Sequence, residues 1–474
     1  MKIDKLKYVY FLGIAGIGMS SLARYFHSKG FWVGGYDRNQ SPLSLELEKE
    51  GIEIIYAEEV ESLPDFLREP REENLIIHTP AIPSQNLLKR FFLEKGFQLY
   101  KRSQVLGEVC KSYKVIAVAG THGKTTTCSM ISYVLKSGGL DITAFLGGIS
   151  TNFNTNYLKG QSDWAVVEAD EYDRSFLTLY PELAIITSMD ADHLDIYGTL
   201  ENMFIAFNQF SQQIRERGQL IAKIGLPLEK SRFSYGIGKE TGADIYAERI
   251  RISEGKYWFD YHEGSQIIPD FQLEIPGNHN IENALATIKI ALILGLKPSL
   301  IRENLSQFKG VKRRFEYIFK SSHTLFIDDY AHHQDELKAF LETIRSLYPD
   351  KKITAIFQPH LFSRTRDFYH EMANSLSLVN ELWLMEIYPA REEPIEGISS
   401  KILFDQVKLE NKFILDRKEI LSRIEKDPKE IILTIGAGSI DQLVEPIREI
   451  LEKREKAIQE NSEKGRKEGK ENAG

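Results

Sequence analysis

Short apolar runs alternate with helical periodicity along most of the chain. The first run, residues 8–12, leads into a glycine-rich turn, a helical pattern that reaches about Ser28 and a second apolar run at residues 31–36. Strands buried on both faces of a parallel sheet read as continuous apolar runs, and helices return the chain between them. The pattern therefore predicts a β-α-β unit at the start of the chain, with further strands at residues 52–56 and 75–79.

The apolar run that begins at Val115 ends in a second glycine-rich segment, which precedes a helical pattern. That segment reads Gly120, Thr121, His122, Gly123, Lys124, Thr125 and Thr126. Backbone N–H groups of such a loop close around phosphate oxygens, while a lysine neutralises charge and a threonine hydroxyl can ligate Mg²⁺. The spacing between the glycines is two residues shorter than in the usual P-loop. A chance surface turn is the alternative, but the strand before and the helix after it favour a nucleotide phosphate site.

The rest of the chain repeats the alternation and divides into three blocks. Apolar runs recur at residues 164–167, 184–187, 324–327, 353–357, 382–385 and 431–435, and short alternating segments between about 225 and 275 predict an antiparallel excursion. We predict an α/β protein of three domains. These are a Rossmann-like N-terminal domain over residues 1–112, a central parallel sheet of the P-loop ATPase type over 113–312 and a C-terminal Rossmann-like domain over 313–452. Residues 453–474 are almost all charged or small, which predicts a frayed extension of the last helix followed by a disordered tail.

Composition narrows the class of protein. The chain is 42% apolar and 27% charged, and no apolar stretch approaches the roughly 18 residues of a membrane span. The net charge of −8 argues against a nucleic-acid track, which needs clustered Lys and Arg. Glycines interrupt the apolar N-terminal stretch, so we do not interpret it as a secretory signal. Two cysteines form no disulfide framework, and a reducing cytoplasm is the simplest setting.

Acidic residues follow two of the central apolar runs. Glu168, Asp170, Glu171 and Asp173 come after the first, and Asp190, Asp192, His193 and Asp195 come after the second. Carboxylates at the strand ends beside a phosphate loop are placed to hold Mg²⁺, which prefers oxygen ligands. A solvated acidic loop is the alternative. Two such clusters suggest two metal positions, and Glu168 stands at the end of its strand.

Amides, cations and histidines complete the candidate chemistry. Asn280 and Asn283 lie three apart at the start of a predicted helix, and helix capping alone would explain one of them. A short basic cluster that includes Arg314 marks the second domain boundary, where solvated hinge charges are the alternative. The remaining candidates follow strands of the third block: Asp328, Asp329, His332 and His333, then His360, Arg364 and Arg366. We interpret them as a rim that handles anions and amines. A zinc site at the adjacent histidines is disfavoured, because their rings point in different directions.

Taken together, these segments resemble the Mur ligase family, ATP-dependent amide-bond-forming enzymes of peptidoglycan synthesis. The resemblance covers about residues 7–450, with the motifs in order across all three domains. It is carried by Gly13-Ile-Ala-Gly-Ile-Gly-Met-Ser20, Gly120-Thr-His-Gly-Lys-Thr-Thr126, Asp192-His-Leu-Asp195, Asp329-Tyr-Ala-His-His333 and Tyr388-Pro-Ala390.

The resemblance implies a role for each matching residue. Gly13, Gly16, Gly18 and Asp37 would bind the UDP part of a sugar nucleotide. Residues Gly120 to Thr126 would bind ATP, with Lys124 on its phosphates. Thr125 and Glu168 would hold one Mg²⁺ and His193 a second. Asn280, Asn283 and Arg314 would bind adenosine and position the phosphates, and Asp329 would reach the nucleotide on domain closure. Lys124, Glu168, His193 and Asp329 would thus be catalytic, while His332 and Arg364 would orient the amino acid.

The activity implied by the resemblance is ligation of L-alanine to the carboxylate of UDP-N-acetylmuramate through an acyl phosphate. It also implies ATP and Mg²⁺ as cofactors, a cytoplasmic monomer or homodimer, and no nucleic-acid or membrane partner. Later ligases of the pathway use a carbamylated lysine, and this chain has no lysine from Gln161 to Ala222, which favours the alanine-adding step. Leu361 stands where many relatives have arginine, so amino-acid binding would depend on Arg364 or another cation. The alternatives are a recycling ligase that adds a murein tripeptide and a P-loop nucleotide-binding regulatory module.

Overall fold

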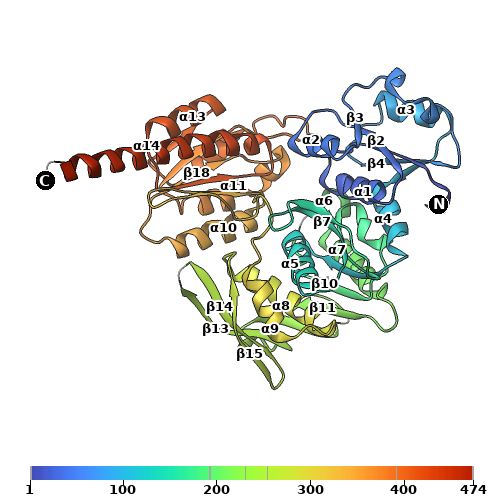
Figure 1. Ribbon diagram of the computed structural model, residues 1–474, viewed down its shortest axis with the longest axis horizontal. Helices are drawn as coiled ribbons and strands as arrows, with labels where there is room; N and C mark the ends of the chain where they lie inside the picture. Colours follow the sequence, from blue (N-terminus) through green and yellow to red (C-terminus); the bar gives the residue numbers. More distant parts are fainter. Residues whose placement is uncertain (1–2, 192–193, 230, 254, 391, 472–474) are drawn as a thin grey trace. The chain divides into compact units, whose positions relative to one another are not determined.

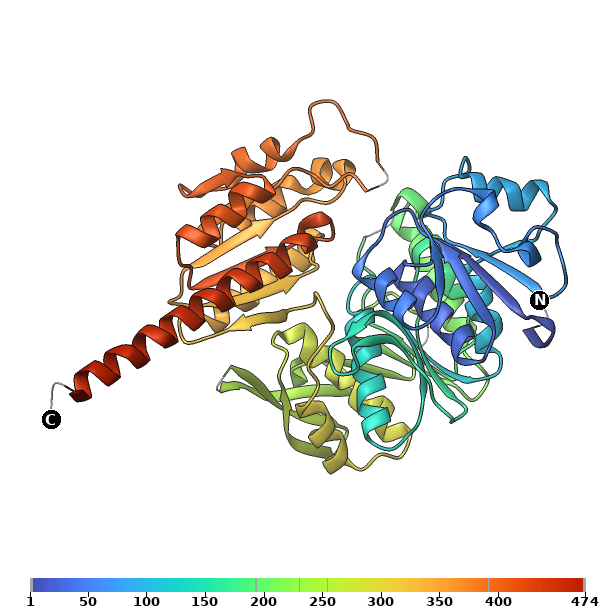
Figure 2. The ribbon, with the colours of Figure 1, turned by 45° about the horizontal axis from the view of Figure 1, so that its top comes forward.

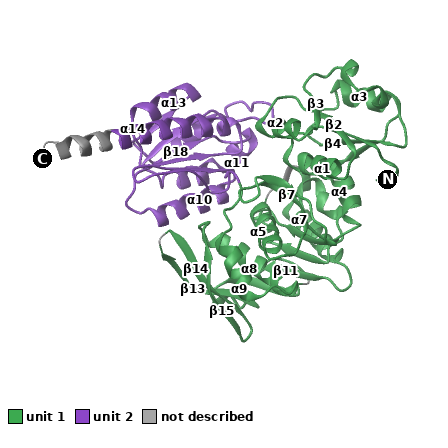
Figure 3. Ribbon diagram, in the orientation of Figure 1, with its two compact units in different colours: residues 1–311 green, residues 312–474 purple. Residues whose placement is uncertain are grey.

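The computed structural model describes residues 3–191, 194–229, 231–253, 255–390 and 392–471, and within them the chain builds three β-sheets with helices between the strands (Figure 1). Residues 1–311 form one compact unit, which holds the first two sheets, and residues 312–474 form a second (Figure 3). The prediction of an α/β protein with parallel cores is therefore confirmed.

The first sheet is entirely parallel, in the order β3-β2-β1-β4-β5. Its strands are β1 (Tyr8–Leu12), β2 (Trp32–Tyr36), β3 (Glu53–Ile55), β4 (Asn74–His78) and β5 (Leu99–Lys101). The intervening helices are α1 (Ile17–Ser28), α2 (Pro42–Lys49), α3 (Leu87–Glu94) and α4 (Arg102–Cys110). Strand order reverses at β1, and ligands of such sheets bind where the order reverses, outside the carboxyl ends of the strands. The glycine-rich turn after β1 lies at this position.

The second sheet has the order β15-β14-β13-β12-β11-β10-β6-β9-β7-β8. Its strands are β6 (Lys114–Ala119), β7 (Thr143–Ser150), β8 (Thr155–Leu158), β9 (Trp164–Glu168), β10 (Leu183–Ile186), β11 (Gln219–Lys223), β12 (Phe233–Ile237), β13 (Ile245–Ser253), β14 (Lys256–Glu263) and β15 (Gln266–Leu273). Its helices are α5 (Lys124–Ser137), α6 (Leu194–Tyr197), α7 (Leu200–Gln212), α8 (Asn278–Ile293) and α9 (Pro298–Ser306). The predicted antiparallel excursion is present but begins only at β13, because β12 pairs in parallel with both of its neighbours.

The first two sheets form one unit because they share a core. One hydrophobic cluster runs from Leu6 to Ala222 and includes side chains of both sheets. A buried polar network adds to it: Arg24 of α1 donates to Glu50 and, through Nη1, to Asn156 Oδ1 of β8 at 2.5 Å. Asn156 in turn donates to the carbonyl oxygen of Ile17 at 2.6 Å. Buried polar groups of this kind are stable only when all their partners are present, so the network ties the start of α1 to the second sheet.

The sheet of the second unit has the order β16-β17-β21-β18-β19-β20, and it is parallel except for β16. Its strands are β16 (Glu316–Lys320), β17 (Leu325–Asp329), β18 (Ile353–Phe357), β19 (Glu381–Leu384), β20 (Lys412–Ile414) and β21 (Ile431–Ile435). Helices α10 (Gln334–Leu347), α11 (Phe362–Leu376) and α12 (Ser400–Gln406) pack on one face of this sheet. Helices α13 (Arg417–Lys426) and α14 (Val444–Glu471) pack on the other (Figure 2).

Beyond residue 452 the chain continues the last helix. We expected a frayed extension of that helix before a disordered tail over 453–474, and α14 continues to Glu471. Apolar residues such as Ile447 and Leu451 dock the start of this helix on the sheet. Arg448 pairs with Glu445 and with Glu452, one turn to either side of it. Docking fixes the first turns of the helix, so each further residue extends it without the cost of nucleation. Ion pairs between residues three or four apart stabilise it further.

Candidate active site

The loop between β6 and α5 has the geometry of a phosphate-binding loop. Gly120 has φ +132° and Gly123 has φ +81°, conformations that side-chain-bearing residues rarely adopt. A Cβ on Gly120 would also lie 2.1 Å from Thr187 Oγ1. Lys124 is the first residue of α5, so the helix N-terminus faces the loop. Both glycines are therefore required by the backbone, in the strand–loop–helix setting that the sequence predicts.

Lys124 is folded back onto its own loop. Its Nζ donates to the carbonyl oxygens of Gly120 (2.5 Å) and Thr121 (3.1 Å) and pairs with the Glu171 carboxylate at 2.9 Å. The Glu171 side chain is only 1% exposed. Burial lowers the pKa of Lys124, but the charges of Glu171 and the neighbouring acids outweigh it and hold that pKa above its usual value. Lys124 therefore stays a cation in the loop, where phosphate oxygens can replace its present acceptors.

The segment after β10 fixes the shape of the loop. The Thr187 hydroxyl donates to the carbonyl oxygens of Ala119, at 3.1 Å, and of His122. Ser188 Oγ accepts from the His122 N–H at 2.8 Å. Thr121 Oγ1 accepts the N–H of Asp190 at 3.0 Å. Sequence reasoning assigned no role to Thr187 and Ser188; the signal for them is their position directly after the strand that pairs with β6.

Glu168 lies at the carboxyl end of β9, next to the phosphate loop, as predicted. Val118 of β6 pairs with Glu168 across the sheet, and the Glu168 carboxylate accepts the N–H of Gly147 at 3.1 Å and bonds to the Thr125 hydroxyl. Burial raises the pKa of Glu168, opposed by the charge of Lys124 and the bond to Thr125. A buried carboxylate beside a threonine hydroxyl is a pair of oxygen donors that suits Mg²⁺. The donor set therefore fits this ion. His193, the predicted ligand of a second ion, lies outside the described residues.

Asn280 and Asn283 lie at the start of α8, and Asn283 is next to the phosphate loop. Asn280 Nδ2 donates to the carbonyl oxygen of Pro276 at 2.6 Å, and Asn283 Nδ2 donates to Asn280 Oδ1 at 3.2 Å. A Cβ on Gly123 would lie 3.0 Å from Asn283 Oδ1. Asn280 thus bonds back to the segment before α8 without capping the helix, whose N-cap residue is Gly277, while Asn283 lies against the phosphate loop.

The glycine-rich turn after β1 is held by the acid at the end of β2. Asp37 Oδ2 accepts the N–H of Ala15 at 2.9 Å. Gly13 has φ +88°, and Gly16 is the N-cap residue of α1. The predicted members Gly13, Gly16 and Asp37 are therefore brought together at the carboxyl edge of the first sheet.

In the second unit, Asp329 ends β17 and is buried. Its carboxylate accepts the N–H groups of Phe315 and Ala331, each at 2.7 Å. Arg314 Nη1 donates to Glu336 at 3.3 Å, and its guanidinium lies 5.1 Å from the centre of the Tyr330 ring. Asp329 thus anchors the chain where it enters this unit, a structural role that the sequence did not predict.

The predicted amino-acid residues, His332 and Arg364, gather around His360, which the sequence placed in the same rim without a specific role. The rings of His332 and His360 are centred 5.4 Å apart, and Arg364 Nη1 lies 3.5 Å from His360 Nδ1. The Tyr388 ring stacks on His360 at 5.8 Å. His332 Nδ1 lies 3.2 Å from a carboxylate oxygen of Glu336. The structure therefore brings His332 and Arg364 together and adds His360 between them.

Titration of Asp329 should make the second unit less stable as pH rises. Burial raises the pKa of Asp329 from 3.8 to about 7. A raised folded-state pKa means that the proton favours folding, so the contribution is present below about pH 4 and is lost as pH rises through 7. At about 1.4 kcal/mol per pKa unit this amounts to on the order of 4 kcal/mol. Hydrogen exchange of the β17 amides, measured from pH 4 to pH 8, should show this loss in the wild type but not in Asp329→Asn.

The exposed Asp350→Asn variant is the control and should follow the wild-type profile. Parallel profiles for wild type and Asp329→Asn would contradict the assignment.

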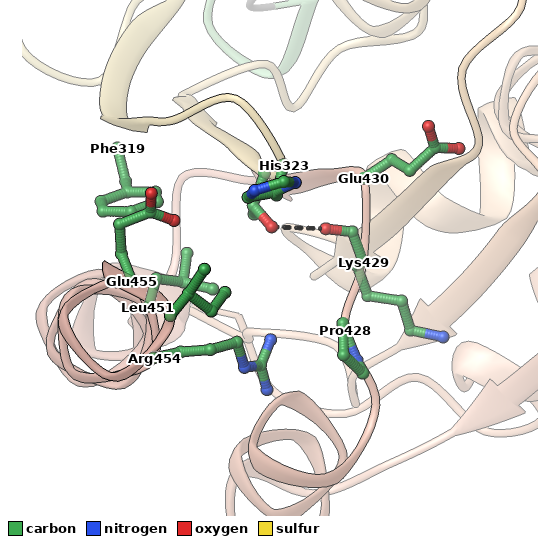
Figure 4. A pocket seen from close by; sticks show the side chains of 10 residues that line it. Phe319, His323, Pro428, Lys429, Glu430, Leu451, Arg454 and Glu455 are labelled. Carbon is green, nitrogen blue, oxygen red and sulfur yellow. Dashed lines mark hydrogen bonds between the residues drawn. The ribbon is translucent and has the colours of Figure 1, made fainter. Parts of the chain in front are cut away.

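The second unit also has a cavity of about 270 Å³ (Figure 4). None of the residues that line it belongs to the candidate site. His323 and Thr324 line it just before β17, and Lys429 and Glu430 line it just before β21. It therefore opens at the amino edge of the sheet, opposite Asp329, whereas ligands of such sheets bind at the carboxyl edge. Lys429 is already paired with Glu381 and Asp427, each at 2.6 Å. We assign the cavity no part in the site.

No helix among the described residues combines the length and the apolar character needed to cross a membrane.

Comparison with known proteins identifies related sequences and folds over almost the whole chain. Residues 8–114 match the Mur ligase family catalytic domain, residues 118–291 the Mur ligase middle domain and residues 313–438 the Mur ligase glutamate ligase domain. The UDP-N-acetylmuramate–L-alanine ligase of Parabacteroides distasonis is 46% identical, covering 95% of this chain and 98% of the relative. That of Christiangramia forsetii is 44% identical, with the same coverage. The crystal structure of UDP-N-acetylmuramate-alanine ligase from Thermotoga maritima superposes with a TM-score of 0.81 at 28% identity, covering 95% of this chain and 99% of that one.

Proposed function

The chain belongs to the Mur ligase family, and we propose that it ligates L-alanine to the carboxylate of UDP-N-acetylmuramate at the expense of ATP. The observation that carries the proposal is the 46% identity to a ligase of this activity over 95% of the chain, across all three domains. The phosphate loop with Lys124 and the buried Glu168 beside it support the proposal, because they suit the phosphates and the metal ion of ATP. The proposed substrates are cytoplasmic metabolites, which suits an enzyme of precursor synthesis.

The chemistry explains why a phosphate loop is required. A carboxylate and an amine do not condense in water, so phosphoryl transfer from ATP first converts the muramoyl carboxylate to an acyl phosphate. The amine of L-alanine then attacks the carbonyl carbon, and phosphate leaves from the tetrahedral intermediate. Lys124 and the backbone N–H groups of the loop stabilise the charge on the phosphoryl group as it is transferred. The acyl phosphate must be kept from water. Closure of the C-terminal domain would exclude water from the site.

The remaining roles follow the resemblance. Thr125 and Glu168 would hold one Mg²⁺ and His193 a second. Mg²⁺ at such sites neutralises charge on the phosphates. The turn with Gly13, Gly16, Gly18 and Asp37 would bind the UDP moiety. Asn280, Asn283 and Arg314 would bind adenosine and position its phosphates, with Asp329 near the nucleotide. His332 and Arg364 would orient L-alanine.

One assay tests the proposal against its alternatives. Purified protein with ATP, Mg²⁺ and UDP-N-acetylmuramate is given L-alanine, glycine, L-serine or the murein tripeptide, and ADP release is followed. We expect L-alanine to stimulate ADP release most strongly. Activity with the tripeptide alone would indicate the recycling ligase. Nucleotide binding without stimulation by any amine would leave only a nucleotide-binding module.

Replacing Arg364 by alanine should raise the KM for L-alanine by about tenfold while changing kcat less, because a guanidinium that binds a carboxylate contributes mainly to substrate binding. Initial rates at varied L-alanine concentration measure this. Arg448→Ala is the control: Arg448 lies on α14, on the other face of the sheet, and pairs with Glu445 and Glu452. An unchanged KM in Arg364→Ala would remove this residue from the amino-acid site.

A further inference from the structure

Glu171 is the buried acidic partner of the phosphate-loop lysine. Lys124 Nζ contacts three acceptors, which are the carbonyl oxygens of Gly120 and Thr121 and the carboxylate of Glu171. An ammonium group has three N–H donors, so these acceptors match all of them. A phosphate oxygen can therefore bind Lys124 only by replacing or sharing one of the three.

The Glu171 carboxylate is the acceptor that a phosphate would replace. Carboxylate and phosphate are both anions that form charge-assisted bonds to an ammonium group, whereas the two carbonyl groups are neutral parts of the loop itself. The Lys124 side chain is 13% exposed and that of Glu171 is 1% exposed, so solvent screens their charges poorly. A nucleotide phosphate at Lys124 would therefore also meet the negative charge of Glu171.

The backbone around Glu171 holds its carboxylate in place. The Tyr197 hydroxyl donates to the carbonyl oxygen of Glu171 at 2.7 Å, and the Arg174 guanidinium lies 5.7 Å from the centre of the Tyr197 ring. Asp173 and Arg174 both have left-handed backbone conformations, with φ +52° and φ +55°. Consecutive residues of this kind persist only where their surroundings fix them, and they cluster at functional sites. Glu171 is thus held beside Lys124 by more than its own ion pair.

We propose that Glu171 competes with nucleotide phosphates for Lys124 and thereby limits how tightly the phosphate loop binds ADP. Weaker binding of this product favours its release after each ligation. The inference rests on the proposed function, which places ATP at this loop. It gives a role to an acid for which the family resemblance implied none.

Isothermal titration of the full-length protein with ADP, without added Mg²⁺, tests the inference. In Glu171→Gln we expect ADP to bind about tenfold more tightly, because the competing charge is lost while the shape of the side chain is kept. The KM for ATP should fall by a similar factor without a rise in kcat. Glu171→Asp keeps the charge, so it should bind ADP more weakly than Glu171→Gln does.

Asp173→Asn is the matched control, because it removes the same charge from the same segment. Asp173 pairs with Lys101 at 2.6 Å, outside the phosphate loop. Asparagine also tolerates the left-handed conformation of this position. The ADP affinity of Asp173→Asn should stay within about twofold of wild type.

Tyr197→Phe provides a second variant, which removes the hydroxyl that holds the Glu171 backbone and keeps the ring. It should tighten ADP binding in the same direction as Glu171→Gln, but by less. Unchanged or weaker ADP binding in Glu171→Gln would overturn the inference, because a purely structural role predicts a loss. The titration needs no L-alanine: a wild type that binds ADP but ligates no amine would contradict only the proposed function, whereas one that binds no ADP would contradict both.

Discussion

Replacing Lys124 by alanine is expected to lower kcat for ligation by roughly a thousandfold, the scale of losing a cation or donor that stabilises developing charge. Lys124 is the one residue of the phosphate loop whose side chain contacts the carbonyl oxygens of Gly120 and Thr121 and the carboxylate of Glu171 at the same time. Without it, the proposed phosphate site would lose this cation. ADP release dependent on UDP-N-acetylmuramate and L-alanine measures the effect.

The loss should be chemical rather than structural, and two controls separate these causes. Lys136→Ala removes a lysine near the other end of α5 that pairs with Asp141, and it should leave kcat near wild type. UDP binding by Lys124→Ala should also be retained, because the proposed UDP site lies on the first sheet. A wild-type kcat in Lys124→Ala would remove the residue from catalysis.

Replacing Glu168 by glutamine should lower kcat/KM for ATP by about a hundredfold and raise the Mg²⁺ concentration needed for half-maximal rate. Glutamine has the same shape, and its carbonyl oxygen can still accept the N–H of Gly147. The change therefore removes charge with little effect on packing. Burial already raises the pKa of Glu168, so the carboxylate is a group whose charged form gains from a nearby cation.

Asp173→Asn is the matched control for that experiment. Asp173 belongs to the same acidic segment, but its carboxylate pairs with Lys101 at 2.6 Å. It should keep a wild-type dependence on Mg²⁺. If Glu168→Gln and Asp173→Asn behave alike, the assignment of Glu168 as a metal ligand is wrong.

Local features of the site were predictable because each depends on a few neighbouring residues. Gly120 and Gly123 allow backbone conformations that other residues resist, and Lys124 follows where a helix starts. The acid at the end of β9 could be placed at the carboxyl edge of a parallel sheet from its position after an apolar run. The pair Asn280 and Asn283 could be placed on one face of a helix from their spacing alone.

Contacts between distant segments were not predictable in this way. His360 had a place in a motif but no role, because only the packing of β18 and α11 sets it beside His332 and Arg364. Composition predicted a frayed extension of the last helix before a disordered tail, but how far that helix runs depends on the docking of its start on the sheet. The types of residue along the chain do not show how much free energy such docking contributes.

The sequence by itself determined the α/β class, the phosphate loop and the strand-end acids, because hydrophobic periodicity and backbone conformation are local properties. Only the tertiary structure decided that β6 lies between β10 and β9, which brings Thr187 and Glu168 to the loop. It also decided that Arg102 fills the space left by Gly18, 84 positions earlier in the chain. The reason is physical: strand order and core packing arise from burying apolar surface shared by remote segments, and the same burial determines which polar groups meet.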